Sequence, residues 1–486
     1  MKWHLASSPA QYFHAQVYGL LKDFEAAALN TADGSTVHVK WRNPADVATL
    51  SSVAQTVHKY MKLNDSEIVI VNDPFSGGSQ LSDITFVVGI AKTSGPADLL
   101  LTVRLQCAGR IGENSVEQEG VRIPPTPLGT LTQLNTPLVQ AINLHPLAPK
   151  NLAQNIDELI PRLKKVRSQI QELLAQRDNQ FSKSSLQQYF DLCSTATHRR
   201  MGQLPLGDHT ITRKLSSGAN LKLKVSVHDQ IVEFDFSGSE SKGDVHLTDQ
   251  TSLGACVAAT MRATGMNWPI NSGVLSAFAV RTPAKTCVNA SYPSPVRKGV
   301  SEGVFVIADM VFEHLVRNSN YKSAKPAGPS LAIELTFNDG KHLFDYLPNG
   351  RAGSEAAEGK SAMNAWNHDE YQLQSAEKLE REYPLRVVDW GLRFNSAGAG
   401  KNKGGLGLKK SVELLADAEL RWDFSSHVKA EGLSDGEHGT EAEVVVTPPG
   451  GKPKTLPKNG SEKLKAGTIV RWCSAGGGGY GKPKED

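Results

Sequence analysis

The sequence predicts an α+β protein with more than one domain and a β-rich, glycine-rich C-terminal half. Its 486 residues suffice for two or three domains of ordinary size. A hydrophobic fraction of 39% and a charged fraction of 21% are typical of a globular protein with a sizeable core. The sequence changes in character near residue 205, beyond which strands predominate. We therefore expect an N-terminal α/β region at 1–204, and a β-rich region with helices and glycine-rich loops at 205–486.

Charge and cysteine usage narrow the class of protein. The net charge of +3 is close to neutral, and no basic tract is interleaved with aromatic residues, so we expect no nucleic-acid partner. The five cysteines are far apart and never in C-x-x-C spacing, which argues against a disulfide scaffold and fits a reducing cytoplasm. No signal peptide is recognisable, and no uncharged apolar stretch approaches the ~18 residues that cross a bilayer, so we expect no membrane partner.

Hydrophobic spacing predicts the N-terminal elements. Residues 8–28 match one amphipathic helix, with apolar side chains on one face. Runs rich in Val, Ile and Leu, bounded by Gly, Pro, Asp and Ser, predict strands at Glu67–Val71, Thr85–Ala91 and Leu99–Leu105. The residues between the first two runs form a loop by composition.

The clearest predicted helix spans Asn155–Arg177, where apolar residues recur at helical spacing and charged residues fill the other face. Pro161 favours a helix that begins there, because proline suits a first turn. An apolar face of this kind could bind a partner, but packing against the core is the simpler interpretation, which we favour.

Strands and short helices are predicted in the rest of the chain. Residues 210–236 read as β strands with alternating faces. Residues 251–264 and 303–316 have helical spacing. Glycine is frequent beyond residue 385, where short strands are expected at Glu443–Thr447 and Thr468–Arg471.

The loop Asn72–Asp83 is the first candidate for chemistry. It reads N-D-P-F-S-G-G-S-Q-L-S-D and connects two predicted strands. Its glycines allow a sharp turn and a close approach to a ligand. Asp73 and Asp83 could bind a divalent cation or orient a water molecule. The alternative is a turn in which both aspartates cap backbone amides.

Arg104–Gly112 is the second candidate, because it leaves a strand and enters glycines. Cys107 could be a nucleophile if a positive field from Arg104 and Arg110 lowered its pKa. The alternative is a buried, inert cysteine at the end of a strand.

Proline-rich and glycine-rich segments complete the candidates. Glu119–Pro125 is stiff and extended, and we expect it to be structural. Ser396–Gly407 and Gly476–Pro483 match neither a Walker A loop nor a dinucleotide fingerprint. Their amides could form an anion-binding nest, but we expect tight turns. The fourteen histidines show no H-x-x-x-H or H-E-x-x-H spacing.

Taken together, these segments resemble the hydantoinase B / 5-oxoprolinase family, which also includes a subunit of acetone carboxylase. The family loop N-D-P-Y-x-G-G-T-H-L-P-D is similar to the loop described above, and E-G-L-R-I-P-P is similar to the proline-rich segment. The matching segments keep the family's order and cover most of the chain; they are Asn72–Asp83, Glu119–Pro125, Asn271–Val296, Glu377–Val387, Ser396–Gly407 and Ala475–Pro483.

The resemblance implies ATP-dependent opening of a cyclic amide, such as 5-oxoproline or a hydantoin. Phosphorylating the amide oxygen makes a poor electrophile open to attack, and a metal ion would polarise that oxygen or activate water. In relatives with separate subunits, ATP is bound by a partner of hydantoinase A type. The sequence has no recognisable nucleotide-binding motif, which agrees with such a partner. The resemblance also implies a place in glutathione metabolism, a cytoplasmic location and an oligomer.

The metal site implied by the resemblance is altered in this sequence. The family histidine in T-H-L-P-D is Gln80 here, and two histidines of R-A-H-H-A-D are Gln106 and Cys107. Asp83 remains, so the candidate ligands are Asp83, Gln80 and Gln106. A glutamine amide oxygen is a far poorer ligand for a transition metal than imidazole, so a divalent cation would be held loosely.

Three hypotheses about function follow. The first is a subunit that opens a cyclic amide with ATP and a partner, with Asp73 and Cys107 as catalytic candidates. The second is an inactive homologue that retains the fold and the partner interface. The third is an enzyme with altered chemistry, which uses Cys107 or an aspartate differently. A distant histidine, such as His38 or His145, could also replace a lost ligand.

Overall fold

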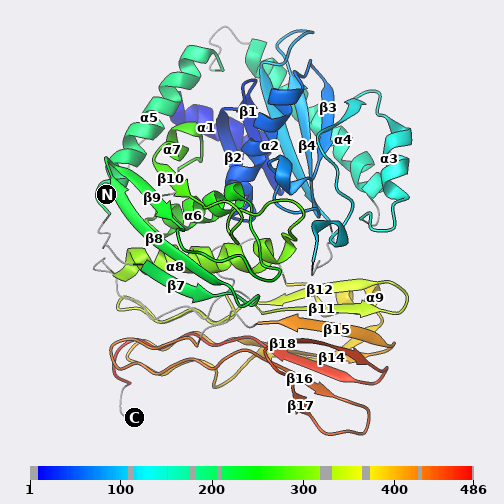
Figure 1. Ribbon diagram of the computed structural model, residues 1–486, viewed down its shortest axis with the longest axis vertical. Coiled ribbons are helices and arrows are strands. Elements are labelled where there is room, and N and C mark those ends of the chain that lie inside the picture. Colours follow the sequence, from blue (N-terminus) through cyan, green and yellow to red (C-terminus); the bar gives the residue numbers. More distant parts are fainter. Residues whose placement is uncertain are drawn as a thin grey trace. The chain divides into compact units, whose positions relative to one another are not determined.

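The computed structural model describes residues 9–107, 114–149, 152–175, 181–204, 210–266, 268–317, 331–363, 373–424 and 429–483. Within these ranges the fold is α+β, as the sequence predicts, with helices and four β-sheets (Figure 1). The chain divides into two compact units. The first unit comprises Met1–Arg213 and Ala219–Val311, and the second comprises Lys214–Gly218 and Phe312–Asp486. The domain boundary expected between residues 204 and 205 stays a prediction.

The first unit is built on a six-stranded antiparallel sheet of order β2-β1-β5-β4-β3-β6. The runs of Val, Ile and Leu that predicted three strands form β3, β4 and β5 in the middle of this sheet, where both faces are buried. The six strands are β1 (Ala26–Thr31), β2 (Thr36–Lys40), β3 (Glu67–Val71), β4 (Asp83–Ile90), β5 (Leu99–Gln106) and β6 (Thr126–Thr130).

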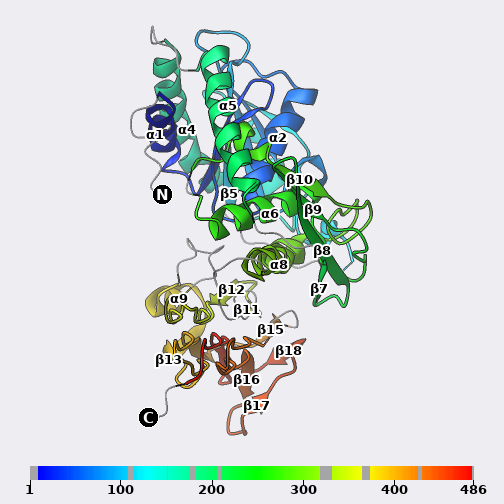
Figure 2. The same cartoon turned by 90° about the vertical axis from the view of Figure 1, so that its left-hand side faces the viewer.

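Helices cover both faces of this sheet. Helices α1 (Pro9–Leu21) and α4 (Leu152–Ala175) lie on one side of β5, and α2 (Asp46–Tyr60) lies on the other (Figure 2). Helix α3 (Thr136–Asn143) packs on α4, and α6 (Asp249–Ala263) packs on α2.

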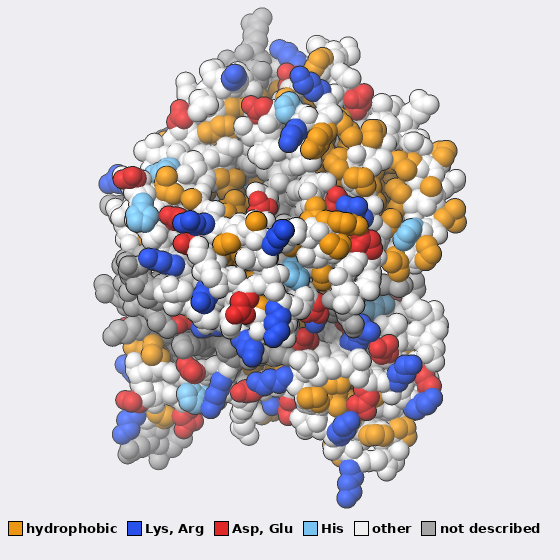
Figure 3. Space-filling view, in the orientation of Figure 1, with side chains coloured by type: hydrophobic (Ala, Val, Ile, Leu, Met, Phe, Trp, Pro, Cys, Tyr) orange, Lys and Arg blue, Asp and Glu red, His pale blue; other side chains and the backbone are white. Residues whose placement is uncertain are grey.

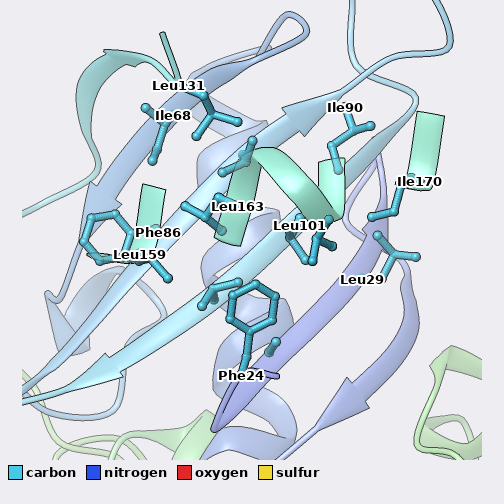
Figure 4. Close-up of a cluster of buried hydrophobic side chains, with 14 of the residues drawn as sticks. Phe24, Leu29, Ile68, Phe86, Ile90, Leu101, Leu131, Leu159, Leu163 and Ile170 are labelled. Carbon is cyan, nitrogen blue, oxygen red and sulfur yellow. The ribbon is translucent and has the colours of Figure 1, made fainter. Parts of the chain in front are cut away.

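The period-two alternation of β4 explains why two cores form. Phe86 points toward α4, where it joins the main hydrophobic cluster together with Leu163 and Ile170 (Figure 4). Val88, two residues further along the strand, belongs to the same cluster. Val87 points to the opposite face and packs in a smaller cluster with residues of α2. Each central strand therefore separates two apolar layers, and any polar side chain in these strands near α2 requires a polar partner.

A second, four-stranded sheet of order β10-β9-β8-β7 follows in the chain. It confirms the strands expected at 210–236, and α6 and α8 confirm the expected later helices. The remaining elements up to residue 317 are η1 (Pro74–Ser76), η2 (Val116–Gln118), α5 (Lys183–Met201), β7 (Thr210–Lys214), β8 (Asn220–His228), β9 (Ile231–Asp235), α7 (Ser272–Leu275), β10 (Phe278–Arg281), η3 (Gly299–Gly303) and α8 (Val304–Arg317).

The second unit contains two sheets that share one hydrophobic cluster, in which Trp422 and Trp472 are the largest members. One sheet has the order β12-β11-β15-β18, and the other β13-β14-β19-β16-β17. Strands β16 and β19 confirm the two short strands predicted near the C-terminus. The elements are β11 (Leu331–Phe337), β12 (His342–Leu347), α9 (Ala376–Glu382), β13 (Leu385–Leu392), β14 (Leu408–Leu414), β15 (Ala418–Asp423), β16 (Glu443–Thr447), β17 (Lys454–Thr455), β18 (Asn459–Leu464) and β19 (Ile469–Cys473).

The glycine-rich segments of the second unit pack backbone against backbone. Gly477 N–H donates to the carbonyl of Gly405 at 2.9 Å, and Gly405 N–H donates to the carbonyl of Arg351 at 2.8 Å. A Cβ on Gly477 would lie 2.0 Å from the Arg351 oxygen, and one on Gly398 would lie 2.1 Å from the Glu437 oxygen. The expectation that Ser396–Gly407 and Gly476–Pro483 form tight turns is wrong for most of these glycines, which instead allow neighbouring segments of the chain to approach closely. We call the four segments 349–361, 396–407, 430–440 and 475–481 the glycine lattice.

Two helix predictions need correction. The helix expected at 8–28 ends at Leu21, and Ala26–Thr31 forms β1. Pairing of β1 with β2 and β5 on both edges outweighs the helical preference of its alanines. Pro161 lies inside α4, which begins at Leu152. The apolar face of α4 packs in the main core, as we expected.

None of the described helices is both long and apolar enough to cross a bilayer. On the face seen in Figure 3, acidic and basic side chains are interspersed, in keeping with the net charge of +3.

Candidate functional site

Strand register brings two predicted site residues together at one end of the main sheet. Asp83 begins β4 and lies opposite Gln106, which ends β5; the next pair on this face is Thr85 and Arg104. Because side chains alternate along a strand, all four point to the face that α2 covers. The two neighbouring cross-strand pairs thus bring together the carboxylate of Asp83, the amide of Gln106 and the buried guanidinium of Arg104.

The loop before β4 is fixed by Asn72. Its Nδ2 donates to the carbonyl oxygens of Leu81 (2.8 Å) and Val121 (2.9 Å), and its Oδ1 accepts the N–H of Ile123 at 2.6 Å. Gly77 closes the turn with a φ of 95°, in the left-handed region that suits glycine. The first family-like motif is thereby tied to the proline-rich second motif.

Asp73 serves this turn as a cap. Its Oδ1 accepts the N–H of Phe75 at 3.1 Å, its Oδ2 accepts Ser76 Oγ at 2.8 Å, and Arg122 Nη1 lies 3.4 Å from Oδ2. These contacts occupy both carboxylate oxygens, in line with the capping alternative for Asp73.

Asp83 accepts polar groups from its own loop. Its Oδ2 accepts hydrogen bonds from Ser79 Oγ at 2.6 Å and from Gln80 Nε2 at 3.1 Å. The amide oxygen of Gln80 accepts a hydrogen bond from Arg297 Nη1 at 2.7 Å, and the same nitrogen donates to Ser82 Oγ at 3.1 Å. The structure thus brings Gln80 and Asp83 together and adds a guanidinium from a distant segment.

This arrangement of Gln80 and Arg297 does not fit a divalent cation. A cation on the Gln80 oxygen would displace the hydrogen bond from Arg297 and lie beside its fixed positive charge. Within the described part of the chain, no group of three or more His, Cys, Asp and Glu side chains is placed to hold a metal ion. His38 lies on β2, which β1 and β5 separate from β4.

Cys107 follows Gln106 at the end of β5 and is half-buried. Its N–H donates to the carbonyl of Ser82 at 2.8 Å. Burial, and then the negative charge of Asp83, raise the pKa of the Cys107 thiol to about 12. The thiol therefore stays protonated near neutral pH, which does not suit a nucleophile. Of the two arginines expected to activate it, Arg104 forms an ion pair with Asp46, and Arg110 lies outside the described residues.

Two contacts join the third motif to the first two. Glu119 Oε1 accepts the N–H groups of Val296 (2.9 Å) and Arg297 (2.8 Å). The rings of Phe75 and Tyr292 meet edge to face with centroids 5.9 Å apart. Segments separated by more than 160 residues in sequence therefore converge near Asp83, and Glu119–Pro125 is structural, as we expected.

A small cavity lies beside this convergence, on the α2 side of the sheet. It is lined by the buried side chains of Asp46, Asp83 and Arg104 and by exposed Gln106. Glu25, Ala26, Arg42 and Asn43 complete its lining. Asp73 and Gln80 are not among the lining residues. The cavity is therefore distinct from the capped turn, although Asp83 belongs to both surroundings.

The sequence indicated only part of this cavity. Asp83 and Gln106 were expected, and Arg104 was named only as a source of positive field. Asp46 was missed because it lies 37 residues before Asp83 and in a helix that we did not predict. Arg297 was missed because its contact with Gln80 spans 217 residues. A buried arginine in a hydrophobic strand was the one available signal, since it requires an acidic partner.

Several relatives match nearly the whole chain in sequence. An uncharacterized protein of Methanocaldococcus jannaschii is 25% identical over 95% of this chain and 85% of its own length. The 5-oxoprolinase 1 of Arabidopsis thaliana is 22% identical over 94% of this chain, but this covers only 39% of that protein.

Solved structures share the fold. An ATP-dependent caprolactamase from Pseudomonas jessenii has a TM-score of 0.80 at 16% identity, covering 97% of this chain and 89% of the other. A nucleotide-free acetone carboxylase has a TM-score of 0.78 at 13% identity, covering 97% and 74%. The family model for hydantoinase B/oxoprolinase matches residues 21–483. The chain therefore belongs to the hydantoinase B/oxoprolinase family.

Proposed function

We propose that this chain is a subunit that opens a cyclic amide by ATP-dependent hydrolysis, together with a separate ATP-binding subunit of hydantoinase A type. The substrate class is that of 5-oxoproline and hydantoins, and with 5-oxoproline the reaction would belong to glutathione metabolism in the cytoplasm. The observation that carries this proposal is the convergence of three family motifs around Asp83, through Asn72, Glu119 and Arg297.

The names of the relatives support the reaction class. One relative is named 5-oxoprolinase, and one structural neighbour is an ATP-dependent caprolactamase. A cyclic amide is a poor electrophile, so coupling to ATP is chemically reasonable. The sequence contains no recognisable nucleotide-binding motif, which supports a partner chain that binds ATP.

A second candidate is an inactive homologue that retains the fold and the partner interface. The hydrogen bond from Arg297 to Gln80 favours this candidate, because the arginine occupies the amide oxygen that would bind a metal ion. The two candidates differ in one measurable respect, which is whether ring opening accompanies ATP hydrolysis.

Reconstitution with the ATP-binding subunit tests the proposal. A subunit of hydantoinase A type is co-purified with this chain, and ADP and ring-opened product are measured with 5-oxoproline and with hydantoin. We expect equal amounts of ADP and product, only with both subunits and ATP. ATP hydrolysis without ring opening on either substrate would contradict the proposal and favour the inactive homologue.

Two variants locate the site in the same assay. Asp83→Asn is expected to lower ring opening by at least tenfold, whereas Asp65→Asn, in an ion pair with Arg167 elsewhere in the first unit, serves as the matched control. Cys107→Ser is expected to retain activity, because the thiol is protonated near neutral pH. Loss of activity in Cys107→Ser with normal folding would favour altered chemistry through the cysteine.

A further inference from the structure

The cavity beside Asp83 contains a buried donor that no described residue satisfies. The Arg104 side chain is only 3% exposed. Its Nη1 donates to Asp46 Oδ1 at 2.5 Å and to Thr49 Oγ1 at 3.0 Å, and its Nε donates to Thr85 Oγ1 at 3.2 Å. Its Nη2 is buried and has no hydrogen-bond partner within the described ranges. A buried guanidinium nitrogen without an acceptor is costly, so it indicates a bound ligand.

The same cavity contains an acceptor with spare capacity. Both hydrogen bonds that Asp83 accepts from described side chains, those of Ser79 and Gln80, reach Oδ2. No hydrogen bond from the described part of the chain reaches Oδ1. Asp83 and Arg104 both line the cavity, so the residue with an unsatisfied donor and the residue with a spare acceptor meet at one space.

Charge and size limit what this space can hold. The Arg104 guanidinium would repel a cation, and the carboxylates of Asp46 and Asp83 would repel an anion, so a neutral dipolar ligand fits best. The cavity has a volume of about 10 Å³. One water molecule needs roughly 10–15 Å³ and two to four polar partners, whereas an amide ring is far larger.

We propose that this cavity binds one water molecule, which accepts a hydrogen bond from Arg104 Nη2 and donates one to Asp83 Oδ1. The ion pair with Asp46 and the hydrogen bond to Thr85 fix the guanidinium, so the position of the water is set by the sheet and by α2. Exposed Gln106 lines the same cavity, so we expect a substrate to approach from the side of Gln106. If the proposed function holds, on which this role rests, the bound water is the one that ring hydrolysis consumes, and Arg104 is its positioning residue.

A crystal structure of the full chain, at a resolution that shows ordered water, tests the binding. We expect one peak within hydrogen-bond distance of both Arg104 Nη2 and Asp83 Oδ1. Arg104→Lys can keep the ion pair with Asp46 but lacks the second nitrogen, so the peak should be lost while the fold is retained. A dry cavity, a metal ion at the peak, or an unchanged water in Arg104→Lys would overturn the proposal.

The reconstituted enzyme tests the role. Arg104→Lys should lower kcat roughly a hundredfold, the scale of one lost oriented donor, while KM for the ring and for ATP stays within about twofold. The matched control is Arg167→Lys, which alters an ion pair with Asp65 elsewhere in the first unit and should leave kcat unchanged. A wild-type kcat in Arg104→Lys would overturn the role of the water. If the wild-type pair opens no ring, the proposed function fails, while the crystallographic peak still decides whether water binds.

Discussion

The interior of the first unit is made of side chains, whereas the glycine lattice of the second unit is made of backbone. In the first unit, residues such as Phe86 and Leu163 fill the space between a sheet and its helices. In the glycine lattice, N–H and C=O groups of neighbouring segments bond directly, as between Gly477 and Gly405. A glycine-rich sequence can therefore specify close backbone packing between distant segments as well as turns.

The largest expected effect concerns a buried ion pair within the second unit. Lys410 Nζ lies 2.7 Å from Asp345 Oδ2, and the two side chains are 0% and 2% exposed. Lys410→Met would leave the Asp345 carboxylate buried without its cation, which should destabilise the protein by about 3–5 kcal/mol. The midpoint of urea unfolding, followed by tryptophan fluorescence, measures the change.

The pH dependence of this variant has a definite sign. Burial raises the pKa of Asp345, and Lys410 opposes this shift. Without Lys410 the pKa rises further, so the folded state binds more protons than the unfolded state above the ordinary pKa of aspartate. Stability of Lys410→Met should therefore fall as pH rises from 5 toward 7. The double variant Lys410→Met/Asp345→Leu should regain most of the loss; no recovery would contradict the ion-pair explanation.

The next effect tests the lattice itself. Gly477→Ala places a Cβ 2.0 Å from a carbonyl oxygen, so backbone must shift, and we expect a loss of about 3 kcal/mol. Gly391→Ala is the matched control, because no atom lies within 4 Å of a Cβ there. Equal unfolding midpoints for the two variants would show that the lattice is not closely packed in solution.

A smaller loss of stability is expected in the first unit, where the side chain of Asn72 forms hydrogen bonds with backbone groups. Asn72→Ala removes three hydrogen bonds, one within its own loop and two to the proline-rich segment, and should cost about 2 kcal/mol. Asn64→Ala, at an exposed asparagine, should change stability by less than about 0.5 kcal/mol. An unchanged free energy of unfolding in Asn72→Ala would mean that other contacts hold the loop in place.

The smallest effect distinguishes a cap from a catalyst. Asp73→Ala should cost about 1 kcal/mol, and Asp73→Asn should cost little, because asparagine caps as well as aspartate. Thermal unfolding measures both variants. Ring opening by the reconstituted enzyme should survive in Asp73→Asn; its loss, with unchanged stability, would assign Asp73 to catalysis.

Hydrophobic runs predicted the central strands well, because β3, β4 and β5 are apolar on both faces. The residues of strand β1 were predicted as helix because alanine has a low preference for strands. Strand β1 is stabilised by pairing with β5, which is distant in sequence. Helix α2 was not predicted, although buried Asp46 at its start forms an ion pair with Arg104.

The sequence predicted the parts of the site that are formed by elements adjacent in sequence. Asp83 and Gln106 could be paired because the strands that carry them are adjacent in sequence. Arg297 and Asp46 could not be assigned to the site from the sequence. Their contacts with Gln80 and Arg104 join distant parts of the chain, and local residue spacing does not predict such contacts. The role of Asp73 was open between ligand and cap, and only its partners Phe75 and Ser76 distinguish them.

The glycine lattice has a consequence for how this region can change during evolution. Glycine alone lacks a Cβ, so every replacement at a position such as Gly405 or Gly477 adds an atom where a carbonyl oxygen lies. These positions have no conservative substitute, unlike a leucine in the first unit, which a methionine can replace at modest cost. Glycine also loses the most backbone freedom on folding, so the lattice requires its neighbouring sheets to form with it. Variation in the second unit should therefore concentrate in the outward-facing residues between the glycines, such as Lys401 and Lys403.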